Sequence, residues 1–351
     1  MMTFKNKILA ATLTASMVVL APAVHAQKVL KFAHDNRTDM FENPAHAFTG
    51  VFKNIVESAS NGAIKVEVYP NNQLGSANEH VTMVQNNVIQ GTLTSVGALA
   101  SFYPRMGVLD VPFAFSSNAS TYEVFDGPFG HALADDIEAS LRNVKVLGFP
   151  DTGGFFSVTN SRRAIESIDD FEGIRVRTMT LPSHQRIIQE LGGEAYPLAW
   201  GEVYSALQTG VIDGQMNPVP TISFARFDEV QQYVTLTNHL FSPYTLIISK
   251  RFYDGLTEEE QNILHYAAQS GINASRGVSR VIEASDRGLP GLQGKMQVNA
   301  LSPEERERFR EATQPALIDY IRTTQDEKGG ELLDLFLQET EQANNLRYMA
   351  P

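Results

Sequence analysis

The sequence predicts an α/β protein, and three observations favour this fold class. Strand-like and helix-like segments alternate along residues 29–91, which is the order of a layered α/β domain. The strand-like segments alternate with a period of two residues, whereas the longer segments between them carry apolar residues at helical spacing. A cluster of turn residues at 151–154 then precedes a second run of strands and helices, and its composition suits a hinge.

In the first half of the chain, a strand at 29–33 ends in His34-Asp35-Asn36. Polar residues after such a strand lie where open α/β sheets hold ligands. A helix with one apolar face follows at 44–60. The later elements of this half are a strand at 64–69, a helix at 77–90, a helix at 121–142 with a break near 127–128, and a strand at 144–149.

In the second half, a new strand begins at 155–159, and residues 174–178 alternate between apolar or β-branched residues and two arginines, which predicts a second strand. Thr257 is the expected N-cap of an unusually long amphipathic helix that reaches about residue 287. The remaining elements are a helix at 202–208, a short strand at 211–214 that ends in a turn, a helix from 218 to about 227, a strand at 244–249, a helix capped by Ser302, and a charged helical part at 315–345.

The first 26 residues are predicted to be an export signal. Lys5 and Lys7 precede an apolar run at 8–20, and a small-x-Ala cleavage site ends at Ala26. The run is too short to span a membrane, so we expect cleavage and no membrane insertion. Cleavage removes two lysines and no acids, which changes the formal charge from −12 to −14. Such an acidic chain is a poor partner for nucleic acid or anionic lipid, and an anionic ligand would need a local arginine.

The sequence contains no motif of a catalytic or metal site. It has no cysteine, which excludes disulfides, thiolate chemistry and cysteine metal ligands. The eight histidines are scattered and lack paired metal-ligand spacing, and there is no Gly-x-Ser-x-Gly elbow. We therefore expect no metal, no cofactor and no enzymatic activity. The alternative from another class is an exported hydrolase, because dispersed catalytic groups leave no motif.

The most specific pattern of the chain lies at 173–218. It reads Gly-Ile-Arg-Val-Arg, then Leu-Gly-Gly at 191–193, then Trp-Gly-Glu-Val-Tyr-Ser-Ala-Leu-Gln-Thr-Gly-Val-Ile-Asp-Gly-Gln-Met-Asn-Pro at 200–218. This segment resembles the signature region of the solute-binding proteins of TRAP transporters (tripartite ATP-independent periplasmic), the DctP-like family. An agreement of this length is more specific than any four-residue motif.

The resemblance implies a periplasmic-binding-protein-like fold with two α/β lobes, a ligand cleft between them and a long helix that spans both. The implied lobe I is 27–154 with 243–282, and the implied lobe II is 155–242 with the helical part at 283–351. It also implies a monomeric periplasmic subunit that binds an organic acid and delivers it to the membrane permease subunits of the transporter. A sensor that presents its ligand to a membrane receptor stays open as a further alternative.

The resemblance assigns the ligand carboxylate to Arg177. A planar guanidinium holds a carboxylate through two parallel hydrogen bonds. Asn217 would lie beside the same carboxylate, and Trp200, the only tryptophan, would form a stacking wall as in the ectoine-binding branch of the family. The alternatives are a solvated strand arginine, a turn asparagine and a core tryptophan.

Aromatic residues indicate the body of the ligand. Many organic-acid binders of the family have a second arginine five residues before the asparagine of a Thr-Asn pair, and here Phe155 holds that position. With Phe156, and with Phe241 as a further candidate wall, it favours a monocarboxylate with an apolar or aromatic body, such as an aromatic or branched 2-oxo acid. The alternative is that these rings belong to the core. Tyr204 is a candidate ligand contact, with helix capping as its alternative role.

Asp35 and Asn36 follow the first strand, where the family often places a polar ligand contact. The ectoine-binding branch has two acidic residues there, and this chain has one. The runner-up ligand is therefore a zwitterionic compatible solute such as ectoine, with Asp35 as the partner of its cation.

Overall fold

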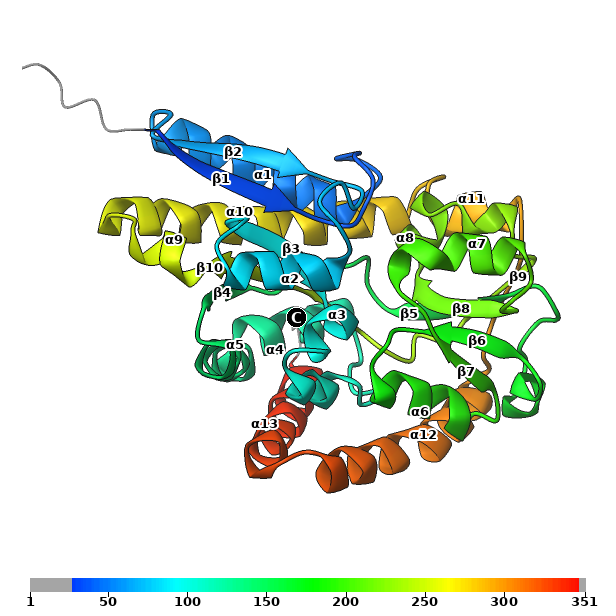
Figure 1. Cartoon of the computed structure of the whole chain (residues 1–351). Coiled ribbons are helices and arrows are strands. Elements are labelled where there is room, and N and C mark those ends of the chain that lie inside the picture. The colour runs from blue at the N-terminus through cyan, green and yellow to red at the C-terminus, as the bar shows by residue number, and fades with distance from the viewer. Residues whose placement is uncertain (1–26, 347–351) are drawn as a thin grey trace, which may run out of the picture.

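The computed structural model describes residues 27–346. Two α/β lobes, each built around its own sheet, lie side by side in Figure 1. The predicted fold class is confirmed. The predicted signal peptide lies outside the described residues. Between residues 27 and 346, no helix is both long and apolar enough to cross a membrane.

The first lobe contains a five-stranded sheet with the order β2-β1-β3-β10-β4. The first three strands are parallel, as expected for strands joined through helices, and β10 returns antiparallel between β3 and β4. The strands are β1 (Lys28–Ala33), β2 (Ile64–Tyr69), β3 (Gly91–Ser95), β4 (Val144–Gly148) and β10 (Tyr244–Ser249). The helices are α1 (Pro44–Ala59), α2 (Ala77–Gln85), α3 (Val96–Ala100), η1 (Pro104–Leu109), α4 (Asn118–Asp126), α5 (Pro128–Leu141) and α9 (Lys250–Asp254).

The second lobe contains a six-stranded mixed sheet with the order β11-β9-β5-β8-β6-β7. Its central strands β5 and β8 are fully buried, so this sheet has its own core. The strands are β5 (Phe156–Asn160), β6 (Arg175–Thr178), β7 (Glu194–Pro197), β8 (Gly214–Pro218), β9 (Tyr233–Leu236) and β11 (Gln297–Ala300). The helices are η2 (Ile168–Phe171), α6 (Pro182–Glu190), η3 (Trp200–Glu202), α7 (Val203–Gln208), α8 (Val219–Phe224), η4 (Phe227–Glu229) and α11 (Leu289–Gln293).

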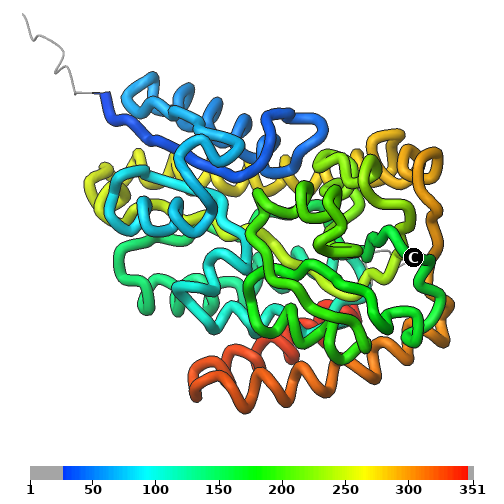
Figure 2. The backbone as a smooth tube through the Cα atoms, turned by 45° about the vertical axis from the view of Figure 1, so that its right-hand side comes forward, coloured from blue at the N-terminus to red at the C-terminus, as the bar shows by residue number. Residues whose placement is uncertain are grey.

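Three long helices connect the lobes. α10 (Glu258–Glu283) packs along α1 and β4 of the first lobe and reaches α8 of the second, as Figure 1 shows. The predicted cap is confirmed, because the Thr257 hydroxyl accepts from the Glu260 backbone N–H and the Glu260 carboxylate accepts from the Thr257 backbone N–H. On the opposite side, α12 (Pro303–Thr324) packs against α6, and α13 (Glu327–Asn344) packs against α4 and α5 (Figure 2). The segment after residue 283 thus contacts both lobes, and the domain boundaries stay a prediction.

The segment with the predicted hinge is tied to its neighbours. Thr152, in the chain between β4 and β5, donates a hydrogen bond from Oγ1 to the Ser242 carbonyl, just before β10, at 2.8 Å. Gly153 and Gly154 have φ values of 136° and 100°, which side chains other than glycine rarely adopt. Their two N–H groups bond to one oxygen of the buried Asp151 carboxylate, at 2.8 Å each. The connection from β4 to β5 and the connection from β9 to β10 are therefore held together at one place.

The predicted strand at 211–214 is wrong, and β8 begins where that strand was expected to end. The Val211 N–H bonds to the Ala206 carbonyl and so completes the end of α7. The Asp213 carboxylate pairs with Arg175 at 2.8 Å. β8 itself has the weak strand sequence Gly-Gln-Met-Asn-Pro, and burial between β5 and β6 overrides that propensity.

Candidate ligand-binding site

The facing edges of the two sheets enclose a cleft between the lobes. The parallel strands β1 and β3 of the first lobe, and β6 and β8 of the second, place their carboxyl ends at the cleft, which is where α/β sheets hold ligands. The cleft has two adjoining chambers with about 480 and 460 Å³ of space, part of it open to solvent.

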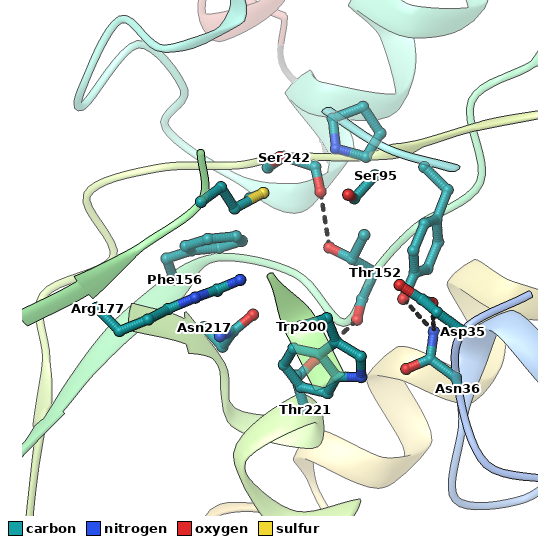
Figure 3. A pocket seen from close by; sticks show the side chains of 13 residues that line it. Asp35, Asn36, Ser95, Thr152, Phe156, Arg177, Trp200, Asn217, Thr221 and Ser242 are labelled. Carbon is teal, nitrogen blue, oxygen red and sulfur yellow. Dashed lines mark hydrogen bonds between the residues drawn. The ribbon is translucent and has the colours of Figure 1, made fainter. Parts of the chain in front are cut away.

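We call the two parts chamber A and chamber B. The residues that line both are Asp35, Ser95, Arg177, Met179 and Trp200. Chamber A, drawn in Figure 3, is completed by Asn36, Thr152, Phe156, Asn217, Thr221, Ser242, Pro243 and Tyr244. Chamber B is completed by Asn72, Ser76, Ala77, Asn78, Gly97, Ala98, Thr180, Leu198, Ala199 and Gly201. Within residues 27–346, no group of three or more histidine and acidic side chains is arranged to hold a metal ion.

Arg177 lies on β6 and is only 4% exposed. Its Nε and Nη2 both donate to the Leu198 carbonyl, at 3.0 and 2.8 Å, which fixes the plane of the guanidinium. Among residues 27–346, Nη1 has no hydrogen-bond partner, and the guanidinium points into chamber A (Figure 3). Burial lowers the pKa of Arg177 to about 10, and Asp35 and Glu202 oppose this shift, so the group stays charged at neutral pH. The free end of the fork can therefore hold a carboxylate through two parallel bonds.

Asp35 and Asn36 follow β1 and lie across chamber A from Arg177 (Figure 3). The Asn36 Nδ2 donates to Asp35 Oδ1 at 2.9 Å and to the Tyr244 hydroxyl at 2.7 Å. Burial raises the pKa of Asp35 to about 6, although its own backbone N–H and the Arg177 charge act to lower it. The first lobe thus contributes a buried carboxylate to a site to which the second lobe contributes a buried cation.

Asn217 lies on β8, beside the strand of Arg177, and its amide reaches chamber A (Figure 3). A relay of buried side chains sets its orientation. Nδ2 of Asn217 donates to Gln215 Oε1 at 2.5 Å, and Gln215 Nε2 donates to Thr159 Oγ1 at 2.9 Å. One amide hydrogen of Asn217 and its oxygen remain available to a ligand.

Two aromatic rings form walls of chamber A. Trp200 lies at the start of η3, and its ring centroid is 6.3 Å from that of Phe224 and 5.8 Å from that of Phe227. Phe156 lies on β5 and is held behind the chamber by edge contacts with His184 and His239. Both rings are thus fixed from behind, which suits them to bind the flat or apolar part of a ligand.

The other predicted aromatic contacts are not brought to either chamber. Phe155 and Phe241 pair in an isolated bridge with ring centroids 6.1 Å apart, and Phe241 belongs to the core beneath the first sheet. Strand alternation sends Phe155 to the face opposite Phe156. The Tyr204 hydroxyl donates to Glu229 at 2.8 Å on the outside of the second lobe. We therefore leave Phe155, Phe241 and Tyr204 out of the proposed site.

Several lining residues were missed by sequence reasoning. Met179 could have been predicted from the sequence pattern, because it stands two positions after Arg177 and strand alternation places both side chains on one face. Tyr244 had a weaker signal as the first residue of a predicted strand. Ser95, Thr221 and Ser242 had none, because nothing local places them at the cleft.

The lobes touch each other beside the chambers. Thr180 Oγ1 donates to the Gly97 carbonyl at 3.3 Å, and a Cβ at Gly97 would lie 2.6 Å from Cβ of Met179. Deeper in the interface, the fully buried Asp110 of the first lobe accepts from Ser183 Oγ at 2.6 Å. Its other oxygen lies 2.9 Å from His184 Nε2, at an angle that does not make a hydrogen bond. These contacts describe a cleft whose two sides have come together.

Two lobes that close over a buried arginine, an amide and aromatic walls define the class of two-lobed solute-binding proteins. The family model of the bacterial extracellular solute-binding proteins, family 7 (DctP), matches residues 38–323. The chain therefore belongs to this family, whose members are the TRAP-type periplasmic solute-binding proteins, and the family resemblance expected from the sequence is confirmed.

Relatives and solved structures agree with this assignment. The chain is 30% identical over 319 residues to the C4-dicarboxylate-binding periplasmic protein DctP of Rhodobacter capsulatus, covering 88% of this chain and 92% of that protein. It is 28% identical over 329 residues to the ectoine-binding periplasmic protein TeaA of Halomonas elongata, covering 93% of this chain and 94% of that protein. The sugar acid binding protein DctPAm from Advenella mimigardefordensis, solved with galactonate, superposes with a TM-score of 0.83 at 30% identity, covering 90% of this chain and 99% of that one. Proteins of this type bind small organic acids, work with membrane permease subunits and are not enzymes.

Proposed function

We propose that this protein is an exported, monomeric solute-binding subunit that captures an organic monocarboxylate with an apolar or aromatic body and delivers it to a TRAP permease. The observation that carries the proposal is the Arg177 guanidinium, which is buried, fixed by the Leu198 carbonyl and open at one end toward the cleft. The class of ligand in the similar structures, organic acids, supports a carboxylate as the group it holds.

The lining of the cleft supports one carboxylate and not two. Among the described residues that line chambers A and B, Arg177 is the only cation. Phe155 holds the position of the second arginine of many relatives, and it faces the core. A second carboxylate in the cleft would therefore be desolvated without a partner, which is costly.

The body of the ligand would lie in chamber A. Phe156, Trp200, Met179 and Pro243 give this chamber extended apolar walls. Burial of one aromatic or branched side chain there contributes on the order of 2 kcal/mol. Because the charged and apolar contacts come from both lobes, the ligand stabilises the closed arrangement, and that arrangement would be the form that docks on the permease.

Ectoine or a similar zwitterion is the second candidate, and Asp35 favours it. A carboxylate opposite Arg177 matches a ligand with one positive and one negative group, and Trp200 would stack on its ring. Asn36, where the ectoine-binding branch has a second acid, weakens the match.

A thermal-shift screen of the mature protein, stripped of ligand by unfolding and refolding, tests the proposal. It compares aromatic and aliphatic monocarboxylates, dicarboxylates, sugar acids and ectoines. A ligand at about 100 times its Kd adds about 2.7 kcal/mol of stability, which raises Tm by a few degrees for a chain of this size. Shifts with apolar monocarboxylates support the proposal. Shifts with dicarboxylates or ectoines alone contradict the proposed ligand class, and the absence of a shift with every carboxylate contradicts the proposed function.

A further inference from the structure

The wall of chamber A opposite Arg177 is rich in hydrogen-bond acceptors. Asp35 is 7% exposed and lines both chambers. Its Oδ1 accepts from Asn36 Nδ2, and among residues 27–346 no other side chain donates to this carboxylate. Its second oxygen can therefore still accept a bond from a molecule in the cleft.

Asn36 adds a second acceptor to this wall. Its amide nitrogen donates to Asp35 at 2.9 Å and to the Tyr244 hydroxyl at 2.7 Å, which uses both hydrogens of the amide. Only the amide oxygen remains free. The Tyr244 hydroxyl hydrogen is the one donor that this small group retains.

The position of these acceptors relative to Arg177 fixes where a ligand group would meet them. Asp35 and Arg177 both line the part of the cleft that the two chambers share. Among residues 27–346, the Arg177 guanidinium bonds to the Leu198 carbonyl and the Asp35 carboxylate to Asn36, not to each other. Arg177 and Asp35 lie on opposite sides of the pocket in Figure 3. A carboxylate bound to Arg177 would therefore lie between them, and a substituent on the neighbouring carbon can point toward the Asp35 wall.

From this arrangement, which rests on the proposed function, we infer that Asp35 selects carboxylates that carry a hydrogen-bond donor on the neighbouring carbon, as in 2-hydroxy and 2-amino acids, over 2-oxo acids. A hydroxyl or ammonium group would donate to Asp35. A 2-oxo oxygen would instead face the Asp35 and Asn36 oxygens, and a buried contact between acceptors is unfavourable. Tyr244 offers its one hydrogen to either ligand, so it does not decide between them. The inference replaces the 2-oxo acid that the sequence suggested as an example.

The ionisation of Asp35 gives the selection a pH dependence. Burial raises its pKa to about 6, so at pH 8 it is a carboxylate that accepts, and near pH 5 it is an acid that also donates. The groups that face it are Arg177 from β6, which remains charged, and Tyr244 from β10. His34, which lies between β1 and Asp35, stays neutral over this range because burial lowers its pKa to about 3. The discrimination against 2-oxo acids should therefore shrink below pH 6.

Calorimetric titration with matched ligands tests the inference. One series comprises 3-phenyllactate, phenylalanine, phenylpyruvate and 3-phenylpropanoate, which differ only at the carbon beside the carboxylate. The corresponding series with a branched aliphatic body is the second. At pH 8 we expect the 2-hydroxy or the 2-amino acid to bind roughly 10- to 100-fold more tightly than the 2-oxo acid. The tighter binder of these two acids shows whether the site prefers a hydroxyl or an ammonium group.

Two variants separate the role of Asp35 from a general effect. Asp35→Asn retains the shape but adds a donor, so the preference over the 2-oxo acid should fall to within about threefold. Asp254→Asn, at an exposed pair on α9, should retain the preference. If Asp35→Asn folds poorly, titration of the wild-type protein at pH 5 serves as the test instead, and it should show the same loss of preference.

Three outcomes overturn the inference. The first is equal or tighter binding of the 2-oxo acid at pH 8. The second is a preference for the 2-hydroxy or 2-amino acid that remains both in Asp35→Asn and at low pH. In these two cases carboxylates still bind and the proposed function stands. If no member of either series binds, both the inference and the proposed ligand class fail.

Discussion

Arg177 and Asp35 reach the same buried part of the cleft from opposite lobes, and each favours the charged form of the other. Burial alone drives both toward neutrality, which leaves pKa values of about 10 for Arg177 and about 6 for Asp35. Each group therefore lacks the close opposite charge that would compensate its burial. A ligand that brings a carboxylate to Arg177 and a donor to Asp35 supplies both partners, which gives a physical reason for the cleft to close around it.

Closure is predicted to depend on the absence of a side chain at Gly97. A Cβ at this position would lie 2.6 Å from Cβ of Met179, and neither atom can move without its backbone. We expect Gly97→Ala to weaken binding at least about tenfold, because the lobes stop short of full closure. Neither chamber loses a polar group in this variant.

Small-angle scattering with and without ligand measures this effect. The wild-type protein should become more compact on ligand addition and Gly97→Ala should do so less. Gly277→Ala is the control, because a Cβ there meets nothing within 4 Å and Gly277 has ordinary helical geometry. Full compaction and unchanged affinity in Gly97→Ala would show that this contact does not limit closure.

Regular amphipathic patterns made much of the fold predictable. The strand at 64–69 and the helix that begins at Pro44 were predicted within one residue, because alternation and an apolar helix face are local signals. β7, β9 and β11 were not assigned, since each has only four residues and gains its pairing from distant strands. β8 was misplaced because its position depends on burial between two other strands, which no local pattern records.

Asp110 is predicted to hold the lobes together independently of the ligand. It is fully buried. Across the interface its carboxylate accepts a hydrogen bond from the Ser183 hydroxyl at 2.6 Å, and its other oxygen lies 2.9 Å from His184 Nε2. Asp110→Ala leaves both partners buried without it and should lower the free energy of unfolding by about 3 kcal/mol.

Urea unfolding curves measure that loss. Asp254→Ala serves as the control, because its pair with Lys250 is exposed and should contribute little. A midpoint for Asp110→Ala that matches the wild-type protein would contradict the structural role assigned to this carboxylate.

The stability of the unliganded protein is predicted to fall as the pH drops from 7 to about 4. Burial lowers the pKa of His34 and of His239 to about 3 from an ordinary value of 6.5, so in this range the unfolded state binds protons at both sites and the folded state does not. Asp35 acts in the opposite direction between about pH 4 and 6, because its folded pKa is raised. Two histidines outweigh one aspartate, which leaves a net loss of about 1.4 kcal/mol per pH unit from these three groups.

Unfolding free energies measured by urea at several pH values test this slope. His239→Gln should reduce the slope of the unfolding free energy against pH by about the amount that binding of one proton to the unfolded state contributes. His131→Gln should leave it unchanged, because His131 is exposed. A stability that is flat or rises toward pH 5 would contradict the buried neutral state of these histidines.

The site was less predictable than the fold, and the reason is geometric. The motif around Arg177 and Asn217 is local, so the resemblance could place both residues at the cleft. Phe155 and Phe156 are adjacent in sequence, and the pairing of Phe155 with Phe241 decides which of the two rings lines the cleft. Ser95 and Ser242 reach the cleft through strand pairing across the first sheet, and that pairing joins segments about 150 residues apart.

The affinity of Arg177 variants for the best carboxylate found in the screen tests the central claim most directly. The measurement is calorimetric titration of the wild-type protein, Arg177→Gln and the control Arg226→Gln, whose arginine is exposed on the second lobe. We expect Arg177→Gln to lose about 2–5 kcal/mol of binding free energy, which is roughly a 30-fold to several-thousand-fold rise in Kd, while Arg226→Gln binds like the wild-type protein. An Arg177→Gln protein that is folded and binds within about twofold of the wild-type affinity would contradict the assignment of the ligand carboxylate to Arg177.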